Sequence, residues 1–328
     1  MKDSTVKDIS NKLNISKSTV SKAIRHCSGV DSETRQCILD EVRIINYQPE
    51  SDCDVYVILP DIPQYFWREL RLGIKEGSMK DLVSIKHNIY TNPKDENAVL
   101  AYLDEAEKLN ARAIIIAAYV TPKIHERLES LKNGRLILML SEYHELINGF
   151  FVGADAYMDG YRMGKEYLSR YSDRKLITLS ITGNSNIQKR LDGFKQAIKE
   201  ENEELLSNAV FIDLERKILK DMKLLPSKLA PLFVDAAGDS QAVCIYSLFG
   251  IFQLPLAITK AKLTKKAVCM CHDYFTEKSD SAMTITCNQD VTLQGRMAME
   301  LAANYVTQKM YPDEKKTIIP SLINISKH

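Results

Sequence analysis

The sequence predicts an α/β protein, with an N-terminal three-helix unit followed by a two-subdomain core built on parallel sheets. Three short amphipathic stretches occupy the first fifty residues, enough for a miniature helical core. From residue 55 onward, apolar strand-like runs alternate with amphipathic helix-like segments in two successive series. A length of 328 residues accommodates two or three domains of this kind.

The composition excludes several classes of protein. Hydrophobic residues make up 45% of the chain and charged residues 27%, an ordinary globular balance. The N-terminus is polar and no run of 18 apolar residues occurs, so we expect a cytoplasmic protein without a membrane partner. The seven cysteines include no CxxC pair and favour reduced thiols over a metal site. Because no GxGxxG, P-loop or GxSxG motif is present, we predict no cofactor and no catalytic residues.

The N-terminal unit consists of three predicted helices. Thr5 is predicted to cap the first helix, and Ser16 the second, which runs to about residue 25. The second helix places Val20 and its apolar neighbours on one side and leaves a hydroxyl-bearing, cationic side outward. Asp31 and Ser32 open the third helix.

This plan is a helix-turn-helix, in which the second helix fits the major groove of DNA. Six basic residues against two aspartates in the first 28 residues suit phosphate contact, although the whole chain has a net charge of only +1. A lysine-rich solvated surface on a three-helix unit without DNA is the alternative at this point.

Residues 5–49 resemble, without a gap, the headpiece of the lac-repressor (LacI/GalR) family. The resemblance is carried by Thr5-Val-Lys-Asp-Ile-Ser, Leu13-Asn-Ile-Ser-Lys-Ser-Thr-Val-Ser-Lys22, Val30-Asp-Ser-Glu-Thr-Arg35 and Asn46-Tyr-Gln-Pro49. It implies that Lys17, Ser18 and Lys22 read bases and that Thr5, Ser16, Thr19 and Ser21 approach phosphates. Lys22 stands where that family usually has Arg, so the bidentate guanine contact of that arginine is not expected at residue 22. Arg25, which stands where Asn is common in the family, is also predicted to bind DNA.

The family's hinge helix is missing from the sequence. After Pro49 relatives usually continue into a short helix whose Leu wedges into the minor groove, but residues 50–54 read Glu-Ser-Asp-Cys-Asp before a strand begins. We therefore predict a short linker over 50–54, less DNA bending, and looser coupling between effector and operator. A shortened linker with function otherwise intact is the alternative.

The remaining residues, 55–328, form the predicted effector-binding core. The motifs Val152-Gly-Ala-Asp155, Arg190-Leu-Asp-Gly-Phe194 and Thr286-Cys-Asn-Gln-Asp290 are similar to those of the periplasmic-binding-protein-like core of the same family. One subdomain is predicted over about 55–154 and 288–328, with the segment 317–325 returning to it, and the other over about 155–287. Ligands of such sheets bind at the carboxyl ends of the strands.

The resemblance implies an effector site for a sugar or sugar-like molecule. Asp155 and Arg190 would line the cleft, Asp273 would accept sugar hydroxyls, and Gln289 would lie on a crossover strand. The alignment can slip by one residue, which would put His272 in the place of Asp273. The predicted effector residues are Tyr65, Phe66 and Trp67 as stacking aromatics, with Asp155, Arg190, Ser247, His272, Asp273 and Gln289.

Each assignment has a structural alternative. Asp155 could only cap a helix, Arg190 could form a surface ion pair, His272 could be structural, and the aromatic residues could be core or dimer contacts. The family commonly has Asn-Asp where this chain has Ser247-Leu248, which indicates a less polar, smaller or differently oriented effector, or a pocket that binds nothing.

The function predicted from these observations is that of a homodimeric regulator of operator DNA, a repressor of carbohydrate-metabolism genes by family precedent. A cytoplasmic sugar-binding protein with weak DNA control is one alternative. A solute receptor for transport would need an export signal and no helix-turn-helix. A sugar-acting α/β enzyme would use carboxylates such as Asp155 and Asp273.

Overall fold

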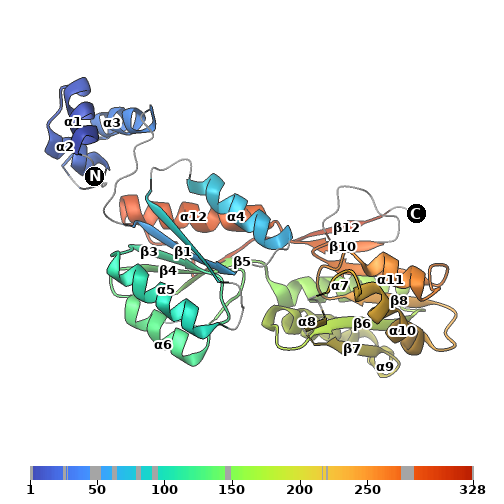
Figure 1. Cartoon of the computed structure of the whole chain (residues 1–328). Coiled ribbons are helices and arrows are strands. Elements are labelled where there is room, and N and C mark those ends of the chain that lie inside the picture. Colours follow the sequence, from blue (N-terminus) through green and yellow to red (C-terminus); the bar gives the residue numbers. More distant parts are fainter. Residues whose placement is uncertain are drawn as a thin grey trace. The chain divides into compact units, whose positions relative to one another are not determined.

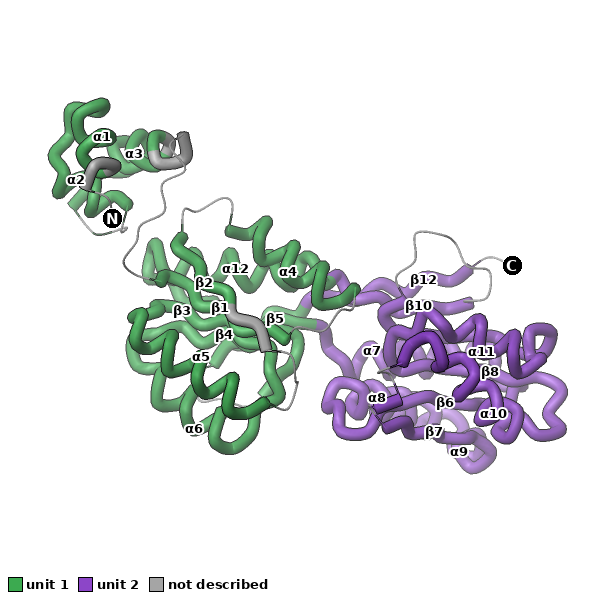
Figure 2. The backbone as a smooth tube through the Cα atoms, viewed as in Figure 1, with its two compact units in different colours: residues 1–153, 291–318 green, residues 154–290, 319–328 purple. Residues whose placement is uncertain are grey.

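The computed structural model describes residues 3–24, 27, 29–44, 53–60, 65–78, 83–90, 95–144, 149–215, 217–218, 221–274 and 284–326. The chain divides into two compact units, one of residues 1–153 and 291–318 and the other of residues 154–290 and 319–328 (Figure 2). No helix within the described ranges combines the length and the apolar character that crossing a bilayer requires.

Three helices form the N-terminal part of the first unit: α1 (Asp3–Leu13), α2 (Lys17–Ile24) and α3 (Ser32–Ile44) (Figure 1). Their shared core contains Val6, Ile9, Val20, Ala23, Ile24 and Ile38. Because α1 already begins at Asp3, the prediction that Thr5 is its N-cap is wrong. The turn between α1 and α2 uses Asn14 at φ 55°, a left-handed conformation that asparagine tolerates.

The first unit also contains a six-stranded sheet in the order β11-β5-β4-β3-β1-β2, and each of its strand pairs is parallel. The strands are β1 (Val55–Pro60), β2 (Ile85–Tyr90), β3 (Ala113–Ile116), β4 (Leu136–Leu140), β5 (Phe150–Gly153) and β11 (Lys316–Ile318). One face is covered by α4 (Tyr65–Ser78) and α12 (Val291–Gln308), and the other by α5 (Glu96–Lys108) and α6 (Pro122–Leu131) (Figure 1). Strands β1, β3 and β4 are buried along their whole length, as their unbroken apolar runs predict.

The second unit holds a second six-stranded sheet in the order β12-β10-β9-β8-β6-β7. Its strands are β6 (Lys175–Ile181), β7 (Val210–Leu214), β8 (Val243–Ser247), β9 (Ala267–His272), β10 (Ile285–Asn288) and β12 (Leu322–Ile325). Helix α7 (Ala156–Tyr171) packs on α8 (Ser185–Asn202), and α10 (Leu225–Ala237) packs on α11 (Leu254–Lys260), while α9 (Glu204–Ser207) is a short turn of helix. All strand pairs are parallel except β10 with β12.

The C-terminal segment corrects the predicted subdomain boundaries. The prediction assigned residues 288–328 to the first subdomain, with one strand-like segment over 317–325. In the structure β11 joins the first sheet, whereas β12 and the residues that follow 318 belong to the second unit, as do residues 288–290. Pro320 lies between the two strands, and proline cannot donate to a strand ladder, so the chain leaves one sheet before it enters the other.

Helices α7 and α8 pack closely through glycine. In the second unit, a Cβ built on Gly160 of α7 would lie 1.9 Å from the Arg190 carbonyl oxygen of α8, and one on Gly193 would lie 2.0 Å from the Tyr157 oxygen. The absence of side chains at these points allows the two backbones to touch. This contact fixes the part of α8 that carries Arg190.

Candidate nucleic-acid interface and effector site

The N-terminus of α2 is capped as predicted. The Ser16 Oγ accepts a hydrogen bond of 3.0 Å from the Thr19 amide and lies 2.7 Å from the Thr19 Oγ1. Ser16 is solvent-exposed, so the cap presents a hydroxyl and the first-turn amides to the surroundings. Amides at a helix N-terminus favour an anionic group such as phosphate.

The two sides of α2 differ as the sequence predicts. Val20 and Ala23 are fully buried and Ile24 is 6% exposed, so this stripe anchors the helix to α1 and α3. On the opposite side Lys17, Ser18 and Lys22 are exposed, and Thr19 and Ser21 are half-buried. Helix α2 contains no acidic residue. The side chain of Thr5 and the whole of Arg25 lie outside the described residues, as does the predicted linker up to residue 52.

A role that the sequence analysis missed belongs to Arg35. Its guanidinium donates hydrogen bonds to the carbonyl oxygens of Ala23 at 3.2 Å, Cys27 at 2.8 Å and Val30 at 3.4 Å. These carbonyls belong to the end of α2 and the loop that leads to α3, which orients α2 on the helical core. Asp31 caps α3 by accepting from the Thr34 amide at 2.8 Å, and that hydrogen bond lowers the pKa of Asp31.

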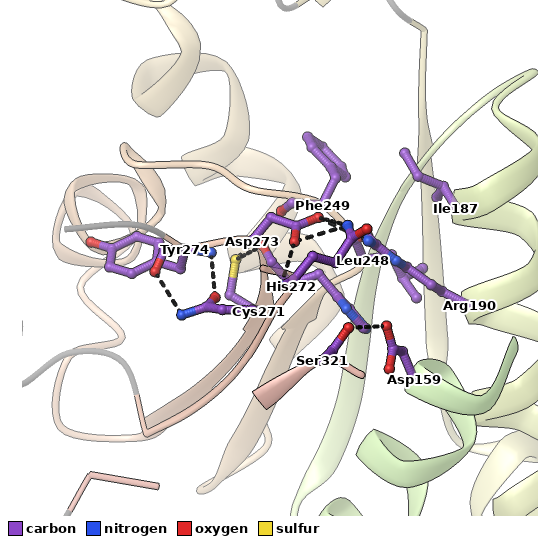
Figure 3. Close-up of polar contacts among 12 residues, drawn as sticks. Asp159, Ile187, Arg190, Leu248, Phe249, Cys271, His272, Asp273, Tyr274 and Ser321 are labelled. Atoms are coloured by element: carbon purple, nitrogen blue, oxygen red, sulfur yellow. Dashed lines mark hydrogen bonds and ion pairs between the residues drawn. The ribbon is translucent and has the colours of Figure 1, made fainter. Parts of the chain in front are cut away.

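In the second unit the structure brings Arg190 and Asp273 together (Figure 3). The Arg190 Nη2 lies 2.8 Å from the Asp273 Oδ2, and its Nη1 donates to the Leu248 carbonyl oxygen at 2.8 Å. Arg190 is only 5% exposed. Burial is the largest single effect and disfavours the charge of Arg190, but the carboxylates of Asp273 and Asp159 act in the opposite direction and the pKa of Arg190 is raised. The alternative interpretation of Arg190 as part of a surface ion pair does not hold, because the pair is buried.

Asp273 also holds the third predicted polar residue. The Gln289 Nε2 donates to the Asp273 Oδ1 at 3.0 Å and Oδ2 at 2.9 Å. Asp273 follows β9 directly and adopts φ 52°. A Cβ on Gly250 would lie 2.4 Å from the backbone carbonyl oxygen of Asp273, so glycine at 250 lets the loop after β8 approach the loop after β9. These loops lie at the carboxyl ends of two parallel strands, where such sheets bind ligands.

His272 and Ser247 have structural partners. The His272 Nε2 lies 2.6 Å from the Tyr246 hydroxyl, and neither His272 nor Ser247 is exposed. Burial, together with the charge of Arg190, holds the pKa of His272 well below its usual range, so the imidazole is neutral. The Ser247 hydroxyl donates to the Phe249 carbonyl oxygen at 2.7 Å. Asp273 rather than His272 thus faces Arg190.

The other predicted effector residues are not part of this cluster. Asp155 caps α7, because its Oδ1 accepts from the Met158 amide at 3.0 Å. Tyr65, Phe66 and Trp67 are half-buried at the start of α4 in the first unit, where the Phe66 and Trp67 rings meet edge to face at 5.1 Å.

Sequence reasoning missed Asp159, Arg162 and Ser321. The Ser321 hydroxyl donates to the Asp159 Oδ2 at 2.6 Å (Figure 3). The Arg162 Nη1 donates to the Ser321 carbonyl oxygen at 3.0 Å. Burial raises the pKa of Asp159. No sequence signal joins residues 159 and 321, because only the return of the chain after β11 brings them together. Among the described residues, no group of three or more histidines, cysteines and carboxylates could hold a metal ion.

Comparison with protein-family models finds a match over residues 5–50, to the model described as bacterial regulatory proteins, lacI family. The match covers the same three helices that place a capped, cationic α2 on a small core. The N-terminal segment is a LacI-family helix-turn-helix domain.

Two curated relatives are transcription regulators. This chain is 28% identical to catabolite control protein A from Priestia megaterium over 102 residues, which cover 28% of this chain and 30% of the relative. Over 209 residues, 60% of this chain and 61% of the relative, it is 22% identical to the HTH-type transcriptional regulator DegA from Bacillus subtilis. The chain thus spans less than two thirds of either curated relative.

Solved structures share the fold over nearly the whole chain. A LacI-family transcriptional regulator from Silicibacter pomeroyi matches with a TM-score of 0.67 at 15% identity, covering 98% of both chains. The transcriptional regulator CelR in its cellobiose complex matches with a TM-score of 0.63 at 12% identity, again over 98% of both. The helix-turn-helix headpiece therefore precedes a two-sheet α/β core of the periplasmic-binding-protein-like type.

Proposed function

We propose that this protein is a sequence-specific DNA-binding transcription regulator whose α/β core binds a sugar-like effector. It acts as a homodimer on a near-palindromic operator, because a single headpiece makes too few base and phosphate contacts for tight binding. By family precedent it is a repressor of carbohydrate-metabolism genes. The effector changes operator affinity by binding two conformations of the core unequally.

The observation that carries the DNA-binding proposal is the two-sided character of α2. Its apolar side is buried in the helical core through Val20 and Ala23, so the opposite side does not pack in that core. That opposite side bears Lys17, Ser18 and Lys22 beside a serine-capped N-terminus. Lysine and serine are hydrogen-bond donors to base edges and phosphates, and α2 carries no carboxylate to repel DNA.

The effector part of the proposal rests on the cluster of Arg190, Asp273 and Gln289. A charged fork, a carboxylate and an amide meet at the carboxyl ends of β8 and β9, and these three groups match the donors and acceptors of a polyhydroxylated ring. CelR, which shares the fold, forms a complex with cellobiose. Leu248 offers only its backbone carbonyl to Arg190, at 2.8 Å, and its buried aliphatic side chain has no polar group for an effector hydroxyl.

The test is selection of a duplex from random DNA by the purified protein at a stated salt concentration. We expect one near-palindromic motif, bound with an affinity that falls steeply as salt rises, because bound lysines displace counterions. A variant with Lys17→Ala and Lys22→Ala should lose the sequence preference while remaining a folded dimer. Specific binding that persists unchanged in this variant would refute the assignment of α2.

The matched control replaces Lys260 and Lys265 with alanine. These two residues are exposed in the second unit and lie outside the headpiece, so the control removes the same charge without touching α2. It should keep the affinity and the sequence preference of the wild-type protein. Equal losses in both double variants would mean that net charge, rather than a reading helix, binds the DNA.

A further inference from the structure

The polypeptide passes between the two compact units three times, after residues 153, 290 and 318. Two of these connections are anchored to the second unit by buried side chains that lie next to the crossing point. Gln289 precedes the second crossing, and Ser321 follows the third. Both anchors are formed entirely by residues of the second unit.

The Gln289 anchor consists of three hydrogen bonds to one carboxylate. The Gln289 Nε2 donates to both carboxylate oxygens of Asp273, at 3.0 and 2.9 Å. The backbone nitrogen of Gln289 also donates to the Asp273 Oδ1, at 3.4 Å. Gln289 is 8% exposed, so water does not compete freely for these bonds. Residue 289 is therefore held in place by a side chain that also belongs to the proposed effector site.

The Ser321 anchor uses a second buried carboxylate. Ser321 is 3% exposed, and its hydroxyl donates to Asp159 while its carbonyl accepts from Arg162. The Arg162 Nη1 lies 3.7 Å from the Asp159 Oδ1, which completes a triangle around Ser321. The charge of Arg190 acts favourably on the Asp159 carboxylate, as it does on that of Asp273. Arg190 is thus electrostatically common to both anchors.

The hydrogen-bonding capacity of Arg190 is not fully used in this arrangement. The Arg190 Nη1 and Nη2 are both bonded, but its Nε is buried and has no hydrogen-bond partner among the described residues. A buried donor without an acceptor is costly, which favours an acceptor arriving from outside. A hydroxyl that accepts from Arg190 and donates to Asp273 would compete with Gln289 for the same carboxylate oxygens.

We propose that Asp273 is shared between the effector and Gln289, so that occupancy of the site loosens the anchor of the second inter-unit connection. This inference rests on the proposed function and specifies how its effector site is read out. Gln289 is then a positioning residue: it senses the effector through Asp273, without any need to touch it. The bistable element is the segment 288–291, tied to the second unit when Asp273 is free for Gln289 and released when it is not.

The experiment is a double-mutant cycle on operator affinity in the full-length protein without any sugar. Asp273→Asn removes the charge that holds Gln289, and asparagine tolerates the φ of 52° at this position. Gln289→Leu removes the anchor from the other side at similar volume. We expect each variant to shift the operator Kd by about fivefold or more in the same direction. The double variant should shift it no further than the larger single change, because both remove one interaction.

Gln188→Leu is the matched control. Gln188 is exposed and bonds to Asp192 one turn along α8, so its loss should leave the operator Kd unchanged. Thermal unfolding of every variant is measured in parallel, since a purely structural role would lower the Tm without shifting the Kd. Additive effects on the Kd, or single variants within twofold of wild type, would overturn the proposal. A wild-type protein that selects no duplex would instead refute the proposed function, and this inference would fall with it.

Discussion

Gly160→Ala is the sharpest test of the packing that positions Arg190 in the proposed effector site. The new Cβ would lie 1.9 Å from the Arg190 carbonyl oxygen and 2.7 Å from the Arg190 Cα. Ordinary van der Waals contact of a Cβ begins at 3.4 Å. Because the obstructing atoms are backbone, no rotamer change can relieve the overlap, and α7 must move away from α8 by about 1.5 Å at this point.

The magnitude follows from two opposing effects. Alanine stabilises a helix interior by about 1 kcal/mol relative to glycine. Overpacking of a close contact costs about 1–3 kcal/mol, and a backbone-to-backbone contact lies at or above the upper end of that range. We therefore expect a net loss of about 2 kcal/mol, which corresponds to a fall in Tm of about 4–8 °C for a unit of this size.

The assay is differential scanning calorimetry of the purified protein. Ser169→Ala, at an exposed position on the same helix, is the control and should change the Tm by less than about 2 °C. The same glycine substitution should weaken effector binding, since it displaces the backbone that carries Arg190. A Tm for Gly160→Ala that equals or exceeds that of wild type would refute the packing argument.

Three further outcomes can be checked independently. Ser16→Ala should lower headpiece stability by about 1 kcal/mol through loss of the cap. Ser16→Asp should keep the stability but weaken operator binding, because it places a carboxylate where phosphate would lie. Urea unfolding measures the first effect and a gel shift the second. His272 stays neutral in the folded protein but takes a proton in the unfolded chain, so stability should fall as the pH drops below about 6.5. The slope of Tm against pH should be smaller in His272→Gln than in wild type. An equal slope in the two proteins would contradict this assignment. Cys27 and Cys37 are the two exposed thiols, so a thiol-reactive dye should label two cysteines in the native protein and all seven after denaturation. The other five are buried, and burial raises the pKa of Cys53 to about 11. A third rapidly labelled thiol in the native protein would contradict that burial.

Local pattern was sufficient for much of the fold. Helix α2 follows from a capping serine and apolar residues at helical spacing, and both are confirmed by the Ser16 hydrogen bond and the burial of Val20. The strands β1, β3 and β4 of the first sheet follow from unbroken apolar runs, because a strand buried on both faces excludes polar residues. The exposed cationic side of α2 was also predictable, because short-range periodicity assigns residues to the sides of a helix.

Local pattern could not decide the effector site. The sequence left His272 and Asp273 as alternatives, and only the structure shows that His272 turns inward to Tyr246 while Asp273 faces Arg190. The physical reason is that His272 is the last residue of β9, whereas Asp273 leaves the strand in a left-handed conformation at φ 52°, which the local sequence pattern does not prescribe.

Taken by itself, the sequence determined the class of the fold, the helix-turn-helix and its exposed cationic side, because each depends on neighbours within a few turns of chain. Tertiary structure alone decided that β11 and β12 belong to different sheets, and that Asp159 meets Ser321 across 162 positions. Contacts of that separation depend on how whole sheets close around a core, which the spacing of residues along the chain does not encode.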